Sequence, residues 1–225
     1  MMQRSLATCG PQAWPAVTSV TVARIAPGAA RLRVVPANEV SWEDLRAVVG
    51  AARAFDALCF CQRFKIVKGW HSVGEEERAH RLRSQAECGY PDAETTCGLV
   101  GYLADEPAAW CAVEPRPAYI RLTRPVTWAG RNEDKTDDGV WAITCTLTRT
   151  PFRWQRFTYQ MVVAAVEYAR ERGAHAVEGY AMLTEPGKEI TWGELHVGSR
   201  GAFAAAGFRE VIRPTKRRVV MRIDL

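Results

Sequence analysis

The sequence lacks the features that mark membrane, fibrous and low-complexity proteins. No apolar run among its 225 residues is long enough to cross a bilayer, and no internal repeat is present. With 48% hydrophobic and 24% charged residues, the composition is that of a globular protein, which excludes disorder throughout the chain. Gly10, Pro11, Pro15 and Pro27 interrupt the first thirty residues, so no signal-peptide core is visible. We therefore expect a cytoplasmic protein with no membrane partner.

Histidine is scarce, and cysteine does not occur in a metal-binding spacing. The four histidines share no spacing with one another or with a nearby carboxylate, which predicts surface positions. The seven cysteines are scattered, and Cys59 and Cys61 have one residue between them instead of the two of a common zinc or redox motif. We therefore expect buried, reduced thiols and no bound metal.

The net charge of +5 is unevenly distributed along the chain. Acidic and basic side chains balance over residues 1–112, so the whole excess lies in residues 113–225. One basic cluster consists of Arg149, Arg153 and Arg156, and a second extends over residues 200–225. Clustered arginines bind phosphate oxygens two at a time, but they also occur on solvated basic edges of sheets. Charge alone leaves both interpretations open.

Hydrophobic periodicity predicts one α/β domain over residues 31–225, preceded by a loosely ordered extension over residues 1–30. Strands are expected at 31–36, 97–103, 108–114, 140–149, 176–182, 210–213 and 218–224, with a further short strand at 17–25. Helices are expected from Ser41 to about Ala54, over 74–88 with every side exposed, from Thr150 to Arg172, and over 199–206. The strands first form a meander and then alternate with helices, which indicates a mixed sheet flanked by helices.

The strand and helix over residues 140–173 carry the most information about function. Thr150 and Pro151 have the sequence of a helix start, with a hydroxyl cap and a proline at the first helical position. Side chains that recur at helical spacing predict one face packed on the sheet; they are Trp154, Phe157, Met161, Ala165 and Tyr168. The free amides at this helix start favour an anion.

This region resembles the donor-binding core of the GNAT superfamily of N-acyltransferases. The resemblance begins at Val140-Trp141 and ends with the run Ala164-Ala165-Val166-Glu167-Tyr168-Ala169-Arg170-Glu171-Arg172-Gly173-Ala174. Further segments agree with the family in the same order: 98–103 with 109–116 for its central hairpin, 176–180 for the strand after the core helix, and 203–211 for the late helix and its Ala-Gly-Phe turn. Cys59-Phe60-Cys61-Gln62 is also similar to an early motif of one bacterial branch. The resemblance covers about residues 31–225.

The resemblance implies a splayed sheet that holds acetyl-CoA, or another acyl-CoA, as the acyl donor in its cleft. In the family, the strand matching residues 143–148 pairs its backbone with the pantetheine arm, and the turn matching 149–158 surrounds the pyrophosphate. The donor-binding residues implied in this way are Thr146, Leu147, Thr148, Arg149, Arg153, Arg156, Phe157, Thr158 and Phe203. Arg156 replaces the first glycine of the family's loop, and Thr158 replaces its second small residue. A bulky residue at a glycine position puts the close backbone contact with phosphate in question.

Several donors and one non-catalytic role remain open. Acetyl-CoA is the default donor and the amine of a small molecule is the expected acceptor. Because the loop glycines are replaced and the C-terminal edge is basic, an aminoacyl-tRNA-dependent or carrier-protein-dependent transferase in specialised metabolite biosynthesis is the first alternative. A CoA- or RNA-binding module without turnover is the second alternative.

The candidate catalytic residues are Glu178, Tyr180 and Glu114. Glu178 and Tyr180 alternate to the same face of their strand, where they would serve as base and acceptor contact, and Glu114 is held in reserve at the end of a hairpin strand. Phe203 stands at the aromatic position of the late helix, where the family often places a tyrosine acid. His196 is the only histidine near the expected acceptor mouth.

Overall fold

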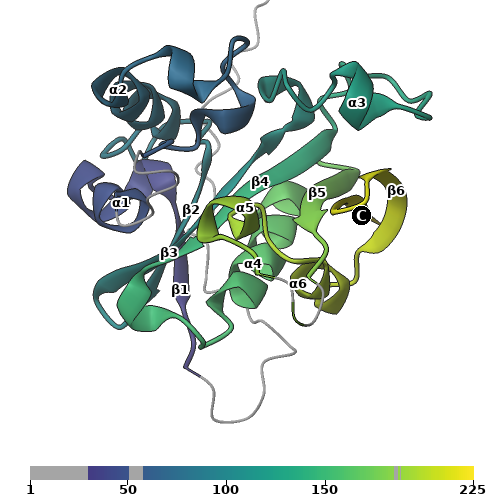
Figure 1. Ribbon diagram of the computed structural model, residues 1–225. Helices are drawn as coiled ribbons and strands as arrows, with labels where there is room; N and C mark the ends of the chain where they lie inside the picture. The colour runs from purple at the N-terminus through teal and green to yellow at the C-terminus, as the bar shows by residue number, and fades with distance from the viewer. Residues whose placement is uncertain (1–29, 51–57, 185–186, 188) are drawn as a thin grey trace, which may run out of the picture.

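The architecture is a seven-stranded mixed sheet with helices on both faces (Figure 1). The computed structural model describes residues 30–50, 58–184, 187 and 189–225. The strand order across the sheet is β1-β2-β3-β4-β5-β7-β6, with β4 and β5 as a parallel pair and every other neighbouring pair antiparallel. The strands are β1 (Arg33–Pro36), β2 (Gly98–Leu103), β3 (Glu106–Pro115), β4 (Val140–Thr148), β5 (Ala176–Met182), β6 (Arg209–Thr215) and β7 (Arg218–Asp224). This confirms the expected α/β class, a meander followed by strand–helix alternation. The strand expected at 17–25 lies outside the described residues.

Helices cover the two faces of the sheet unequally. On one face, α4 (Phe157–Glu171) and α6 (Arg200–Ala205) pack against the centre of the sheet and form the largest hydrophobic cluster. On the other face, α1 (Trp42–Val49) and α2 (Glu75–Ala86) cover β2 and β3. The short helices α3 (Pro125–Trp128) and α5 (Trp192–Leu195) complete the set. None of the described helices has the length and apolar character needed to cross a bilayer.

Local capping explains where two of the helices begin. The Ser41 hydroxyl accepts the amide of Asp44 at 3.1 Å, and the Ser199 hydroxyl accepts that of Ala202 at 3.2 Å. Each bond satisfies an amide that has no partner within the first helical turn. Both starts agree with the sequence prediction, although α1 ends at Val49, earlier than predicted.

Two helix predictions are wrong for physical reasons. The helix expected from Thr150 to Arg172 is interrupted: Thr150–Phe152 form a 3₁₀ turn, and α4 begins only at Phe157. Trp154 therefore lies before the helix and is 91% exposed, whereas its predicted partners on the packed face are buried. Helix α2 was expected to be exposed on every side, but it buries Arg78, whose guanidinium donates to the carbonyls of Leu58, Trp70 and Val73.

Candidate functional site

Strands β4 and β5 pair over only part of their length. Their register extends from Val140 opposite Ala176 to Ile143 opposite Gly179. At this point the pairing of β4 with β3 also jumps, because Ile143 faces Val113 whereas Cys145 faces Ala112. The extra residue, Thr144, forms a β-bulge, which bends the strand that carries it. Beyond the bulge the two parallel strands separate, as the resemblance to the GNAT superfamily implies.

A loop of the chain itself enters the gap between the separated strands. The amide of Thr146 donates to the carbonyl of His196 at 2.5 Å, and the amide of Met182 donates to the carbonyl of Gly198 at 2.9 Å. The amide of Arg149 points back to β3, where it donates to Ala108 at 2.9 Å. Successive strand amides point in opposite directions, so the amide of Thr148 faces the gap.

A cavity of about 610 Å³ lies at the open end of β4, a volume typical of small-molecule sites. Its walls come from β4, the following turn, the start of α4, the loop before α6 and the segment around Cys59. Seven of the nine predicted donor residues line it together: Thr146, Leu147, Thr148, Arg153, Arg156, Phe157 and Thr158. Twelve further residues line it: Val49, Cys59, Phe60, Cys61, Phe152, Trp154, Tyr159, Gly193, Leu195, His196, Gly198 and Ser199. Of these, Phe152 and Trp154 lie in the turn that the resemblance assigns to the pyrophosphate, and His196 was expected near the acceptor mouth. The others carry no local signal for a donor site.

The turn between β4 and α4 adopts glycine-like backbone angles without glycine. Trp154 has φ of +70° and Arg156 has φ of +58° and ψ of +27°, both in the left-handed region. A non-glycine residue there is disfavoured by steric contact of its Cβ, and such residues cluster at functional sites. Arg156 thus has the conformation for which the family's glycine is suited. It is also the residue before α4, and no side chain caps that helix.

Two predicted donor residues do not line the cavity. Arg149 donates to the carbonyl of Pro107 at 2.8 Å and lies 3.8 Å from the carboxylate of Glu106. Phe203 is fully buried against Phe208, with ring centroids 5.1 Å apart. The positions of Phe203 and Gly179 are coupled, because a Cβ built on Gly179 would lie 2.2 Å from the Phe203 ring. Phe203 thus packs beneath β5 and has no place in the cavity wall.

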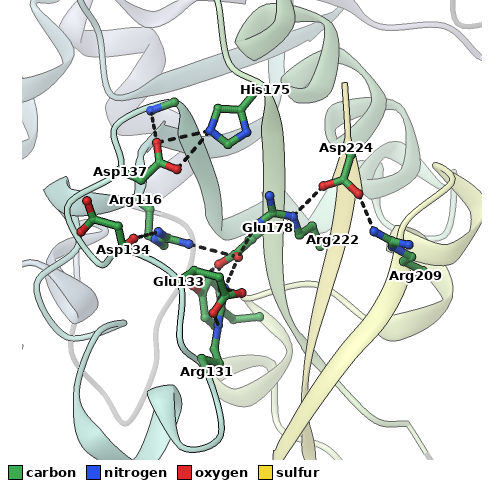
Figure 2. Close-up of polar contacts among 12 residues, drawn as sticks. Arg116, Arg131, Glu133, Asp134, Asp137, His175, Glu178, Arg209, Arg222 and Asp224 are labelled. Atoms are coloured by element: carbon green, nitrogen blue, oxygen red, sulfur yellow. Dashed lines mark hydrogen bonds and ion pairs between the residues drawn. The ribbon is translucent and has the colours of Figure 1, made fainter.

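Glu178 lies within a buried cluster of arginines (Figure 2). Its Oε1 accepts from Arg116 at 3.2 Å, from Arg222 at 3.3 Å and from Arg131. The other oxygen, Oε2, accepts from Arg131 at 3.2 Å and from the hydroxyl of Tyr180 at 2.7 Å. Glu178 and Tyr180 therefore share a face, as predicted. Neither lines the cavity, and the carboxylate is fully buried.

Glu114, the reserve candidate, is ion-paired with Lys65. The two side chains are 16% and 10% exposed, so the pair is mostly shielded from water. The pKa of the neighbouring Tyr119 hydroxyl lies well above its usual value, mainly because the hydroxyl is buried and, to a smaller extent, because of the negative charge of Glu114. Glu114 does not line the cavity.

His196 is buried, contrary to the prediction of a surface histidine, and it is one of the residues that line the cavity. Phe64 stacks on it with ring centroids 6.5 Å apart. Burial, and then the charge of Arg63, lower the pKa of His196 to about 3, so the ring is neutral at physiological pH. Its Nδ1 lies 2.7 Å from the carbonyl oxygen of Gly193, which can only accept. The proton is therefore assigned to Nδ1, and Nε2, which lies 3.5 Å from Nη1 of Arg63, carries a lone pair.

Cys59 and Cys61 line the cavity as thiols that pack against neighbouring side chains. Within residues 30–50, 58–184, 187 and 189–225, no three metal-ligating side chains cluster. Burial raises the pKa of Cys59 to about 11, so its thiol is protonated. The indole of Trp110 donates to the sulfur of Cys61 at 2.9 Å. These contacts describe packed thiols at one wall of the cavity.

Comparisons with known proteins identify the fold. No protein-family model and no curated protein sequence matches the chain. Solved structures do: an acetyltransferase structure superposes with a TM-score of 0.51 at 18% identity, covering 85% of this chain and 98% of the other. A GNAT-family acetyltransferase from Bacillus anthracis superposes with a TM-score of 0.50 at 11% identity, covering 87% and 96%. The chain has the fold of the GNAT acetyltransferases.

Proposed function

We propose that the protein is an N-acyltransferase that moves an acyl group from acyl-CoA, with acetyl-CoA as default, to the amine of a small molecule. The observation that carries the proposal is the cavity at the open end of β4, between this strand and the loop before α6, which is closed at one end by the turn before α4. A fold by itself hosts many functions, so the residues of this site must support the donor.

The start of α4 suits the donor's phosphates. The first amides of a helix have no partner within it and present a positive dipole end to an anion. Arg156, in its left-handed conformation, turns the backbone directly before these amides. Arg153 and Arg156 also line the cavity, and guanidinium groups bind phosphate in paired contacts. The residues that replace the loop glycines therefore preserve the course of the backbone, and Arg156 adds a positive charge.

Residues at the other end of the cavity suit acyl transfer. When bound, acetyl-CoA would supply an activated acyl carbon and a thiolate leaving group. Between the two ends, the Thr148 amide, which faces the gap one residue before the turn, would donate a hydrogen bond to the pantetheine arm of the donor. The neutral Nε2 of His196 would accept a hydrogen bond from an incoming amine and orient its lone pair. With a pKa of about 3, His196 positions the amine and does not retain its proton.

The donor can be tested by comparing acetyl-CoA with acetyl-pantetheine, which lacks the pyrophosphate and the nucleotide. Each is titrated calorimetrically, and thiol release is followed with a panel of amines. We expect acetyl-CoA to bind about 100-fold more tightly, because two or more charge-assisted phosphate contacts are lost in the analogue. Equal affinity for the two donors would contradict the phosphate role of the turn.

The same titration separates the alternative donors. Bulk tRNA and acyl carrier protein are added at two salt concentrations. Retention of tRNA that falls steeply with salt, without acetyl-CoA binding, would favour the aminoacyl-tRNA alternative and overturn the proposal. Binding of acetyl-CoA without turnover of any amine in the panel would favour a binding module.

A further inference from the structure

The guanidinium of Arg63 lies against the wall of the cavity. Its Nη1 donates to the carbonyl of Gly193 at 2.7 Å and lies 3.2 Å from Nδ1 of His196, and both of these residues line the cavity. The neighbouring Phe64 stacks on the His196 ring and packs against the cluster that contains Tyr180 and Val220. Arg63 is half-buried. A cation is therefore held beside the histidine that we propose to meet the acceptor.

A second guanidinium, that of Arg218, approaches the same place from the sheet. Arg218 pairs with Met182 of β5 and lies two residues before Val220, on the same face of β7. It is half-buried; burial, followed by repulsion from Arg63, lowers its pKa. Met182, which pairs with Arg218, donates its amide to the carbonyl of Gly198, two residues after His196, so Arg218 approaches the loop that carries the histidine. Both guanidinium groups also lower the pKa of His196.

No described carboxylate forms an ion pair with either arginine. Glu194 is the acidic group that acts on Arg218, but it is already bound by Arg217 at 2.9 Å and by Thr191 at 3.1 Å. Two like charges that are half-removed from water repel each other, and this cost is offset when an anion lies between them. Arg63 and Arg218 thus carry positive charge that no described carboxylate balances through an ion pair.

We infer that the acceptor is an amine that carries an anionic group, a carboxylate or a phosphonate, and that Arg63 and Arg218 bind this group. The inference rests on the proposed acyltransferase function. The phosphates of the donor would lie at the other end of the cavity, at the start of α4. The acetyl group and the thioester of the donor carry no charge. The anion that would bind between Arg63 and Arg218 therefore belongs to the acceptor. Paired arginines match the planar fork of a carboxylate.

The same two charges favour the reactive form of the acceptor. With the anionic group bound, the two guanidinium groups still leave one net positive charge beside the amine, which destabilises its ammonium form and lowers its pKa. The neutral amine is the nucleophile in acyl transfer, and Nε2 of His196 can accept a hydrogen bond from it. One pair of arginines thus binds the anion and promotes loss of the proton from the amine.

The test compares amino acids with their amides as acceptors, using acetyl-CoA as donor. The amide is nearly isosteric, and its amine is less basic, so more of it is present in the neutral form. Without recognition of the carboxylate, the amide would therefore react faster. We expect the acid to have the higher kcat/KM, by about tenfold or more, as charged hydrogen bonds predict. Aminophosphonates of matching length test the second anionic group.

The variants are Arg63→Gln and Arg218→Gln, with Lys216→Gln as the matched control. Lys216 lies two residues before Arg218 and is exposed, so its variant makes the same change in charge outside the proposed site. We expect each of the first two variants to lower the acid-to-amide ratio about tenfold, mainly through KM, while acetyl-CoA affinity is retained. The control variant should keep the wild-type ratio.

Two outcomes would overturn the inference and leave the acyltransferase function intact. The first is acetyl transfer to acid and amide with equal efficiency, unchanged in the Arg63 variant. The second is a preference for succinyl-CoA over acetyl-CoA that disappears in the arginine variants, since the anion would then belong to the acyl group. Failure of the protein to bind acetyl-CoA at all would instead contradict the proposed function.

Discussion

The hydroxyl of Tyr180 donates a hydrogen bond to Oε2 of Glu178 at 2.7 Å, in a region from which water is excluded. Burial, and then the negative charge of Glu178, raise the pKa of this hydroxyl well above its usual value. The carboxylate also accepts hydrogen bonds from three arginines that come from distant parts of the chain. These contacts make Glu178 the counter-ion that holds β5 to β7 and to the segment over 116–131. A structural role follows for this pair.

Replacing Glu178 with glutamine should destabilise the fold. The side chain keeps its shape but loses its charge, so Arg116 remains buried without its carboxylate partner and Arg131 keeps only Glu133. Breaking a buried ion pair in this way costs about 3–5 kcal/mol. Urea denaturation measures the loss. Glu133→Gln serves as the control, because Glu133 also contacts Arg131 but its side chain is 42% exposed. A Glu178 variant with wild-type stability and no activity would instead indicate a catalytic role.

Replacing Arg156 should separate backbone strain from side-chain charge. Glycine adopts φ of +58° without steric cost, so Arg156→Gly should raise the free energy of unfolding by about 1 kcal/mol. The lost guanidinium should weaken acetyl-CoA binding about tenfold. Arg156→Asn is the matched variant, because asparagine tolerates the left-handed region but carries no charge. Tighter binding in either variant would show that Arg156 disfavours this donor. Thermal denaturation and calorimetry provide the two measurements.

His196 should make stability depend on pH in the acidic range. Its pKa is about 3 in the folded protein and 6.5 when unperturbed, so between these values the unfolded chain binds a proton that the folded chain does not. Stability is therefore complete above about pH 6.5 and falls by about 1.4 kcal/mol per pH unit as the pH is lowered toward 3.

The variant His196→Asn should remove this dependence. The free energy of unfolding is measured at pH 4, 5, 6 and 7. Its slope against pH should be smaller than that of the wild type by the amount that corresponds to about one bound proton. His80→Asn is the control, because His80 lies exposed on α2. An unchanged slope in the His196 variant would mean that the ring titrates normally in the folded state.

Gly179 should tolerate no side chain while Phe203 is present. A Cβ on Gly179 would lie 2.2–2.6 Å from three atoms of the Phe203 ring, so Gly179→Ala forces a shift of well-packed groups. Overpacking of this kind costs about 1–3 kcal/mol. Phe203→Leu alone also destabilises, by leaving a cavity. The double variant should lose less than the sum of the two, and additive losses would show that the residues are not in contact.

Local signals in the sequence were sufficient for most of the secondary structure. The range predicted for β5 agrees with the observed Ala176–Met182, the cap at Ser41 was predicted correctly, and a helix was predicted where α6 follows Ser199. Such signals depend on residues within about one helical turn or on strand alternation. The prediction failed at Trp154, because the turn before α4 is held open by two left-handed residues that are not glycine.

The order of the elements and the position of the turn before α4 were therefore determined by the sequence itself, through periodicity, caps and the resemblance to the GNAT superfamily. The tertiary structure alone decided the surroundings of the candidate residues. Glu178 accepts hydrogen bonds from arginines that lie 62, 47 and 44 positions away in the sequence. The carbonyl of His196 accepts one from the hydroxyl of Thr146, 50 positions away. Contacts over such separations depend on strand register and on the bulge at Thr144, which bring distant side chains together. No local pattern contains that information, since the same alternation permits a carboxylate to meet water, an amine or three arginines.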